Sequence, residues 1–260
     1  MLYSDFVYNL YVPKLKDVNA IFIDGKEYTY LNTKTIDGKE YCVVSIPVVP
    51  SEALKEMELT VKFGSDESVL EGTWKVGVGS YLIKLAESDD TAASNLAKNA
   101  LSYIRAVYAF KDIDDSSVDL ILGEGYDAAN KPNTSVSAAI RTDGASAAAL
   151  ELSSAPCFVI YVKDGYTPEQ YDFAIAGKRP EWTVGVDGEG RTYISVKVYA
   201  YAMTETLTWG VADTGEYGEY NLKAYYEFAL SSEDQKLVDL VERLWKYCES
   251  ALEYRNSVLA

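Results

Sequence analysis

The sequence predicts an α+β fold, mainly β, built as two pseudo-equivalent lobes. Each lobe is expected to be a small antiparallel sheet system closed by a short and a long helix. The 260-residue chain aligns with itself at an offset of 152, so that Phe6 falls on Phe158, and residues 5–48 show eight identities without a gap. A helical pattern follows each aligned stretch at an offset of 144, with Tyr103 falling on Tyr247. Self-similarity at a fixed spacing indicates a repeated structural unit.

The repeat also divides the chain. A stretch rich in Asp, Gly, Asn and Pro separates the two copies, and such composition is typical of loops. We therefore place lobe 1 at residues 1–112, a connector at 113–135 and lobe 2 at 136–260.

The strands of lobe 1 are predicted from runs of aromatic and β-branched residues. These runs are residues 6–12, 20–23, 27–31, 41–49, 57–63 and 73–78. Asp24-Gly25 is a hairpin signal, and Asp37-Gly38 is a second turn. Pro47 suggests that the strand 41–49 ends at a sheet edge or a bend. A short helix is expected at 80–86, and Thr91 or Ser94 is expected to cap a long helix that ends near residue 110.

Lobe 2 repeats this pattern and adds two strands at its front, joined through Asp143-Gly144. Its strands are expected at residues 136–141, 147–152, 156–162, 172–175, 182–186, 192–201 and 206–211. Its short helix is expected at 220–229, and Ser232 or Glu233 should begin a long helix that ends near residue 256. The added strand 147–152 has no equivalent before residue 1. We therefore expect the chain to be cut from a longer protein, whose signal peptide it lacks.

Composition excludes several classes of function. The formal net charge is −16, which argues against binding to nucleic acid or to anionic membrane surfaces. No apolar run is long enough to insert into a membrane. Histidine is absent, which removes Ser-His-Asp and Cys-His catalysis and His-ligated zinc. We therefore expect a protein that is not an enzyme and has no cofactor.

The three cysteines do not recur at equivalent positions of the repeat. Cys42, Cys157 and Cys248 are matched by Ile194, Asp5 and Ile104 in the other copy. A disulfide framework that belonged to the repeat would occur in both copies. We interpret Cys42 and Cys248 as small apolar core residues and expect no disulfide.

Aromatic residues divide into two groups. Those at helical spacing in the long helices, such as Tyr103 and Tyr247, are expected to be core residues that pack against the sheet of their own lobe. The total of 22 Tyr and 4 Trp exceeds what two small cores need, and several of these residues lie among turn residues. Tyr and Trp offer a flat apolar face with a polar group, which suits stacking on a sugar ring. The predicted ligand-binding residues are Trp182, Trp209, Tyr217, Tyr220, Tyr166 and Trp74. The alternative is that these aromatics anchor loops.

Two acidic clusters, at residues 87–90 and 112–119, raise the question of a metal site. Alternate carboxylates can hold calcium, but the spacing matches no calcium-binding loop. We interpret both clusters as solvated connecting segments and expect no metal.

Several segments resemble a known module. TWKVGVGSYLIKLAES with NLAKNALSYIRAVYAFKD, and YNLKAYYEF with LVDLVERLWKYCESALEY, are similar to the helical ends of a duplicated unit in secreted and cell-surface proteins of anaerobic gut bacteria. SSAPCFVIYV, IAGK and RTYISVKVYAYA also resemble its strands. The unit is similar to the two-lobed starch-binding domains of dockerin-bearing amylolytic assemblies. This resemblance implies glycan binding without catalysis, in an extracellular protein that is a monomer within a larger multi-module chain.

Three functions remain at this point. The first is a non-catalytic carbohydrate-binding module, whose partner is a polysaccharide such as starch-like α-glucan held by stacked aromatics. The second is a cell-surface protein-interaction or adhesion module with no glycan ligand. The third is a glycoside hydrolase with paired carboxylates, although the sequence shows no isolated carboxylate pair.

Overall fold

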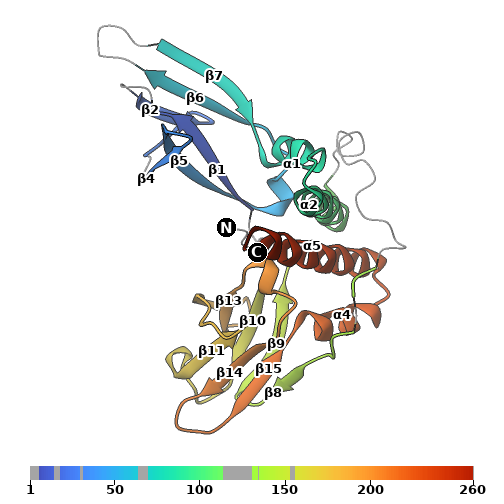
Figure 1. Cartoon of the computed structure of the whole chain (residues 1–260). Coiled ribbons are helices and arrows are strands. Elements are labelled where there is room, and N and C mark those ends of the chain that lie inside the picture. The colour runs from blue at the N-terminus through green and yellow to red at the C-terminus, as the bar shows by residue number, and fades with distance from the viewer. Residues whose placement is uncertain are drawn as a thin grey trace.

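The computed structural model describes residues 6–14, 18–29, 32–63, 70–113, 131–133, 135–152 and 156–259. The predicted class is confirmed: the fold is α+β with mostly strands, and its sheets are antiparallel. Most of the predicted connector 113–135 lies outside the described residues. Two long helices, α2 (Thr91–Phe110) and α5 (Gln235–Leu259), lie side by side in the middle of the molecule (Figure 1). The strands of the first half, residues 6–113, lie on one side of this pair, and those of the second half, residues 131–259, on the other.

The described residues of the first half form two sheets and two α-helices. Its further elements are β1 (Phe6–Pro13), β2 (Val18–Ile23), β3 (Lys26–Tyr28), β4 (Asn32–Ile36), β5 (Lys39–Val48), the 3₁₀ turn η1 (Pro50–Glu52), β6 (Met57–Phe63), β7 (Leu70–Val76) and α1 (Val78–Ala86). One sheet has the order β1-β5-β4 and the other the order β3-β2-β6-β7.

The part of the second half that the structure describes also forms two sheets and two α-helices. Its further elements are β8 (Ile140–Thr142), β9 (Ala145–Glu151), β10 (Cys157–Val162), η2 (Pro168–Gln170), β11 (Tyr171–Ile175), β12 (Trp182–Val186), β13 (Thr192–Lys197), η3 (Ala200–Ala202), β14 (Leu207–Val211), β15 (Tyr217–Tyr220) and α4 (Leu222–Leu230). One sheet has the order β12-β13-β10-β9 and the other the order β11-β14-β15-β8.

The strand register corrects the ungapped alignment of the two copies. Phe6 lies opposite Val48, so a constant offset of 152 would place Phe158 opposite residue 200, but Phe158 pairs with Val196. The same difference of four residues occurs between the β2–β6 and β11–β14 pairs. The lengths of the segments between paired strands therefore differ in the two halves. Segments that connect strands tolerate such changes, whereas slipping the strands themselves would disturb the buried face.

The turn signals are the most accurate part of the strand prediction. Asp24 and Gly25 have φ of 49° and 76°, the left-handed conformation that a two-residue hairpin turn requires. The short strands β4 and β15 are absent from the sequence prediction, since neither has a clear apolar alternation. Of the two alternatives given for Pro47, the sheet edge is wrong, because β5 is the central strand of its sheet. Pro47 is tolerated there because β4 pairs with β5 only as far as Val43. The bend is confirmed, because β5 ends at Val48 and the 3₁₀ turn η1 begins at Pro50.

The helices agree with prediction within a few residues, but their capping residues differ. Asp90 caps α2, because its carboxylate accepts hydrogen bonds from the backbone N–H groups of Ala92 and Ala93. At the start of α5, the carboxylate of Asp234 accepts from the N–H groups of Lys236 and Leu237. In both helices an aspartate next to or near the predicted starting residues takes the cap position. Aspartate is at least as good a cap as Ser or Thr, and its charge complements the helix dipole.

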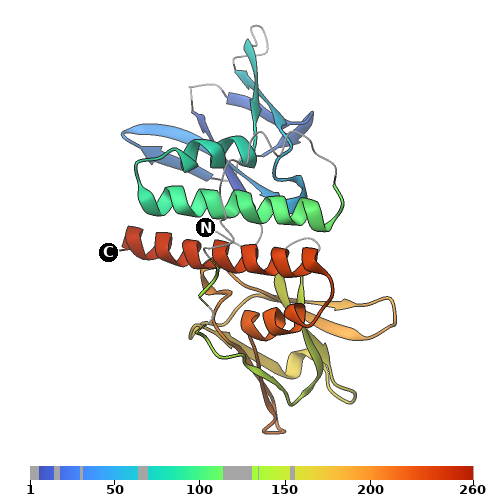
Figure 2. The same ribbon diagram turned by 90° about the vertical axis from the view of Figure 1, so that its right-hand side faces the viewer.

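The two long helices run antiparallel and pack directly on each other (Figure 2). Tyr103 and Tyr247 stack across this contact, with ring centroids 5.8 Å apart and planes within 3°. Phe6 of β1 also packs on Tyr247, at 5.8 Å. A guanidinium nitrogen of Arg243 donates to the hydroxyl of Ser102 at 2.6 Å. The expectation that both tyrosines are core residues is confirmed, and each also packs on the other across the helix pair.

All three cysteines are thiols, and two of them are deep in the core. Cys42 and Cys248 are buried, whereas Cys157 is half-buried. Burial raises the pKa of the Cys42 and Cys248 thiols above the usual range, which suppresses the reactive thiolate.

A thiol reagent is therefore expected to modify Cys157 first in the native protein, and Cys42 and Cys248 only as the protein unfolds. In denaturant without reductant, we expect three reactive thiols. Absorbance of the released chromophore measures both the rate and the count. Rapid modification of two or more cysteines in the native state would contradict the burial, and fewer than three in denaturant would indicate a disulfide.

Among the described residues, no helix has both the length and the apolar character needed to cross a bilayer.

Candidate functional site

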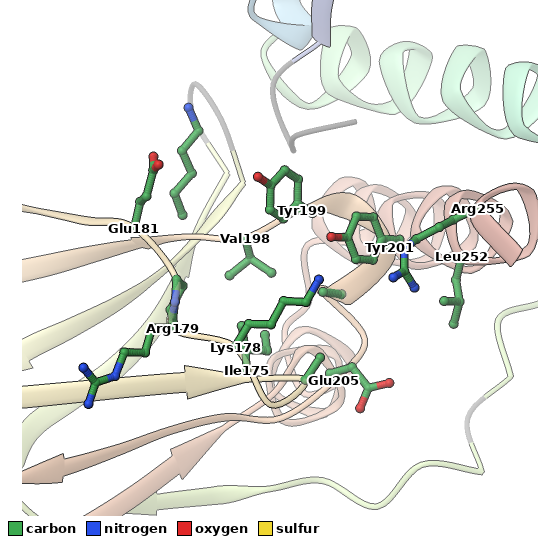
Figure 3. A pocket seen from close by; sticks show the side chains of 14 residues that line it. Ile175, Lys178, Arg179, Glu181, Val198, Tyr199, Tyr201, Glu205, Leu252 and Arg255 are labelled. Atoms are coloured by element: carbon green, nitrogen blue, oxygen red, sulfur yellow. The ribbon is translucent and has the colours of Figure 1, made fainter. Parts of the chain in front are cut away.

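A cavity of about 520 Å³ lies in the second half, between the turn that follows β11, the end of β13, η3 and the last turns of α5 (Figure 3). This volume lies within the range of small-molecule binding sites. The lining residues are Ile175, Ala176, Lys178, Arg179, Pro180, Glu181, Lys197, Val198, Tyr199, Tyr201, Ala202, Glu205, Leu252 and Arg255.

One wall of the cavity is a two-residue turn. Ile175 and Lys178 exchange backbone hydrogen bonds, each 2.9 Å, across Ala176-Gly177. Ala176 and Gly177 have φ of 49° and 70°, so a residue with a Cβ occupies a conformation that favours glycine. The tight turn fixes the backbone of Lys178, whose side chain extends toward Tyr201 and Arg255 (Figure 3).

The opposite wall is an aromatic stack. The rings of Tyr199 and Tyr201 lie 5.2 Å apart at 10°, and the guanidinium of Arg255 lies over the Tyr201 ring at 4.5 Å. Tyr199 is the residue before the 3₁₀ turn and has an extended backbone, and Tyr201 lies inside that turn. The change from strand to 3₁₀ turn brings these two rings, two positions apart in sequence, into a face-to-face arrangement. Arg255 from α5 fixes the stack from the other side.

Charged side chains also line the cavity. Lys178, Lys197 and Arg255 supply cations, and Glu181 and Glu205 supply carboxylates. The guanidinium of Arg179 pairs with Asp172 at 3.0 Å and extends away from the cavity (Figure 3). The site thus combines flat aromatic surface with hydrogen-bond donors and acceptors of both charges.

Of the sequence-predicted site residues, Trp182 lies nearest to this cavity. It follows Glu181, a lining residue, and begins β12 at the edge of its sheet. Its ring packs on Phe173, with centroids 6.4 Å apart, and its side chain remains exposed.

Three other predicted residues, Tyr166, Trp209 and Tyr217, gather around the turn at Asp143-Gly144 between β8 and β9. The indole N–H of Trp209 donates to the backbone carbonyl of Asp143 at 3.1 Å. Lys163 lies over the Tyr166 ring at 5.6 Å, and Arg141 over the Tyr217 ring at 5.3 Å. This end of the second half therefore brings aromatic rings and ion pairs together.

An ion pair fixes this aromatic group. The Lys163 ammonium lies 2.9 Å from the Glu216 carboxylate. Hydrogen bonding from Lys163 lowers the pKa of Glu216 below its usual range, and Tyr166 contributes a further hydrogen bond. The Glu216 carboxylate is therefore ionised at neutral pH and available for the pair with Lys163.

Trp209 and Tyr220 correct the sequence expectation. Trp209 is 1% exposed and Tyr220 4% exposed, so neither ring presents a face to a ligand in this structure. Trp209 covers Gly218 on the neighbouring strand, and Tyr220 packs against Phe158 at 6.0 Å. Burial also raises the pKa of Tyr220 well above its usual range. Their turn-rich sequence context reflects short strands with core-facing side chains, not surface loops.

Trp74 lies in the first half, away from the cavity. It is 50% exposed, and its ring lies over Gly72 on its own strand, where an added Cβ would overlap the indole. The exposure agrees with the expected role, but the structure does not bring Trp74 together with the other five predicted residues.

The sequence prediction missed Tyr199, Tyr201 and Arg255. The first two were included in a strand predicted to run to residue 201, whereas β13 ends at Lys197. The alternation in VYAYAM reads as a half-buried strand, and nothing in it signals the 3₁₀ turn. Among the described residues, no group of three or more potential ligand side chains could hold a metal ion.

No known family model matches this chain, and no curated protein matches it.

Proposed function

We propose that this protein is a non-catalytic carbohydrate-binding module, and that an α-glucan such as starch occupies the cavity at Tyr199 and Tyr201. The observation that carries the proposal is the stacked tyrosine pair beside charged side chains in a cavity of about 520 Å³. The apolar face of a sugar ring packs on an aromatic ring, and its hydroxyls need donors and acceptors nearby.

The geometry suggests how the sugar would be held. Arg255 lies over the ring of Tyr201, which stacks on Tyr199, and both rings line the cavity, so the pair offers aromatic surface to a sugar. Lys178 and Glu205 line the same cavity and offer an ammonium donor and a carboxylate acceptor. Trp182, next to Glu181, would extend the aromatic surface along a longer chain.

We also propose that the two halves are equivalent lobes of a duplicated unit. The sheet β1-β5-β4 parallels β10-β13-β12, and β2-β6-β7 parallels β11-β14-β15. The long helices are antiparallel, and Tyr103 stacks on Tyr247, the same position of the repeat. Contact of a position with its own copy is what a two-fold relation produces. The resemblance to modules of secreted and cell-surface proteins extends the proposal to an extracellular location.

Affinity electrophoresis tests the function directly. The full chain should migrate more slowly in a native gel that contains soluble starch or glycogen than in a gel without polysaccharide. Incubation with the same glucan should release no reducing sugar. Unchanged mobility would contradict glucan binding, whereas release of reducing sugar would favour a glycoside hydrolase.

Replacing Tyr199 with alanine is expected to weaken glucan affinity by roughly five- to a hundred-fold. We take about 1–3 kcal/mol for an aromatic face, by analogy with bases that stack on aromatic side chains, and 1.4 kcal/mol is tenfold. Isothermal titration with a maltooligosaccharide measures the affinity. Phe228→Ala is the matched control, since Phe228 is an exposed aromatic on α4 that does not line the cavity. An equal affinity loss in both variants would argue against a site at Tyr199.

A further inference from the structure

The turn that forms one wall of the cavity contains alanine in an unfavourable conformation. Ala176 has φ of 49°, in the left-handed region that residues other than glycine, asparagine and aspartate rarely adopt. Ala176 also lines the cavity. Among the described residues, every other non-glycine residue at positive φ is an aspartate: Asp24, Asp37, Asp112 and Asp213. Alanine thus takes the place of the residue that this chain otherwise uses there, and it does so at the cavity.

The first half contains the same turn with aspartate at this position. Asp24-Gly25 has φ of 49° and 76°, and Ala176-Gly177 has φ of 49° and 70°. Each turn follows an isoleucine that pairs with a leucine of the neighbouring strand. The pairs are Ile23 with Leu59 and Ile175 with Leu207. The two turns therefore occupy the same place in the two halves, and Ala176 corresponds to Asp24.

The aspartate of the first half bonds across its turn to the next strand. The Asp24 carboxylate accepts a hydrogen bond from the backbone N–H of Glu58 at 2.8 Å. By the strand register, the residue of the second half that corresponds to Glu58 is Thr206. Thr206 directly follows Glu205, which lines the cavity. A carboxylate at residue 176 would therefore lie at the cavity wall beside Glu205, and the methyl group of Ala176 leaves that space to a ligand.

Two further differences between the halves fall on the same cavity. The 3₁₀ turns η1 and η3 each follow a residue with an extended backbone, Val49 in the first half and Tyr199 in the second. Counted from these turns, Ser51 corresponds to Tyr201. The first half forms the turn without either aromatic ring, so the fold does not require the tyrosine pair. Residues that depart from what the fold requires, gathered at one place, are typical of a functional site.

We propose that Ala176 determines whether the cavity accepts a glucan, and that the chain has this site in its second half only. The inference rests on the proposed glucan site and adds the residue that keeps it open. Aspartate at this position would make the turn more stable, but its carboxylate would occupy space that a sugar needs. Alanine gives a less stable turn and an open cavity. Stability and binding therefore oppose each other at residue 176.

Ala176→Asp tests this opposition. The melting temperature should rise by about 2–4 °C, because aspartate tolerates the left-handed conformation and gains a hydrogen bond from the N–H of Thr206. Affinity for maltoheptaose, measured by isothermal titration, should fall about tenfold or more, because the added carboxylate takes space and loses water when a sugar binds. A merely structural role would change the melting temperature alone. The parent should bind one maltoheptaose per chain.

Two further variants separate the cavity from the turn. Asp24→Ala makes the reverse change in the first half, so it should lower the melting temperature by about 2–4 °C and bind maltoheptaose as the parent does. Ala176→Gly also removes the strain but adds no carboxylate. It should therefore bind maltoheptaose about tenfold or more tightly than Ala176→Asp does.

Each contrary result has a distinct meaning. Equal affinity of Ala176→Asp and the parent would overturn the inference and leave the proposed function standing. An equal loss of affinity in Ala176→Gly and Ala176→Asp would also overturn it, because the turn and not the space would then control binding. So would a lower melting temperature of Ala176→Asp, or two maltoheptaose molecules per chain. Absence of binding by the parent would instead contradict the proposed function, and the inference with it.

Discussion

Replacement of Tyr247 by alanine is expected to lower the free energy of unfolding by about 3–5 kcal/mol, the range for large core aromatics. Tyr247 is fully buried, and its ring contacts Tyr103 and Phe6, both from the first half. The substitution leaves a cavity at the place where α2, α5 and β1 meet. Chemical denaturation followed by circular dichroism measures the change.

Tyr247→Phe is the matched control, because it keeps the ring and removes only the hydroxyl. That hydroxyl is buried and has no hydrogen-bond partner among the described residues, and burial raises its pKa far above the usual range. An unpaired buried polar group costs about 1–3 kcal/mol, so the phenylalanine variant should be as stable as the parent or more stable. A loss of more than about 1 kcal/mol in Tyr247→Phe would mean that the hydroxyl does have a partner.

The contact at Tyr247 was only partly predictable from the sequence. Helical spacing correctly placed Tyr103 and Tyr247 in the core, because the 3.6-residue period fixes which side chains share a face. The same period cannot say what that face packs against. The pairing of the two helices with each other is a tertiary arrangement, and the sequence contains no local signal for it.

Turn chemistry was predicted well, and short strands were not. Asp24-Gly25 needs a left-handed backbone that few residues adopt, so its signal is local and specific. The strand β15 has four residues with the sequence YGEY. Its side chains are positioned by pairing with β14 and β8, so the sequence alone reads as a loop.

The candidate site was predicted least well. Reasoning from turn-rich context identified Trp182 near the cavity, but it also selected Trp209 and Tyr220, which are buried. Whether these two rings are exposed depends on which strands lie beside them, and β8 and β9 are far from Trp209 and Tyr220 in the sequence. Tyr199 and Tyr201 were missed because their strand-like alternation concealed the 3₁₀ turn that stacks their rings.

Replacement of Trp209 by alanine is also expected to destabilise the protein by about 3–5 kcal/mol. The indole is 1% exposed, fills the space over Gly218 and donates to the carbonyl of Asp143. The variant should melt early, and any loss of glucan affinity should appear only at temperatures where it unfolds. Reduced affinity in a fully folded Trp209→Ala protein would instead show that this ring takes part in binding.

The contact between Trp209 and Gly218 makes a sharper test. It predicts that Gly218→Ala lowers the free energy of unfolding when Trp209 is present, but not when Trp209 is replaced by alanine. A Cβ added at Gly218 would overlap the indole ring, so Gly218→Ala alone should cost about 1–3 kcal/mol through overpacking. In the Trp209→Ala background the ring is gone, and the added methyl group occupies part of the cavity left behind. Alanine also restricts the unfolded chain more than glycine does, which favours the folded state where the backbone permits it. Gly218 is outside the positive-φ region, so its backbone does permit alanine. Gly218→Ala should therefore be neutral or stabilising in that background, and a double-mutant cycle of unfolding free energies measures the coupling. If the two substitutions were additive, the indole would not lie over Gly218.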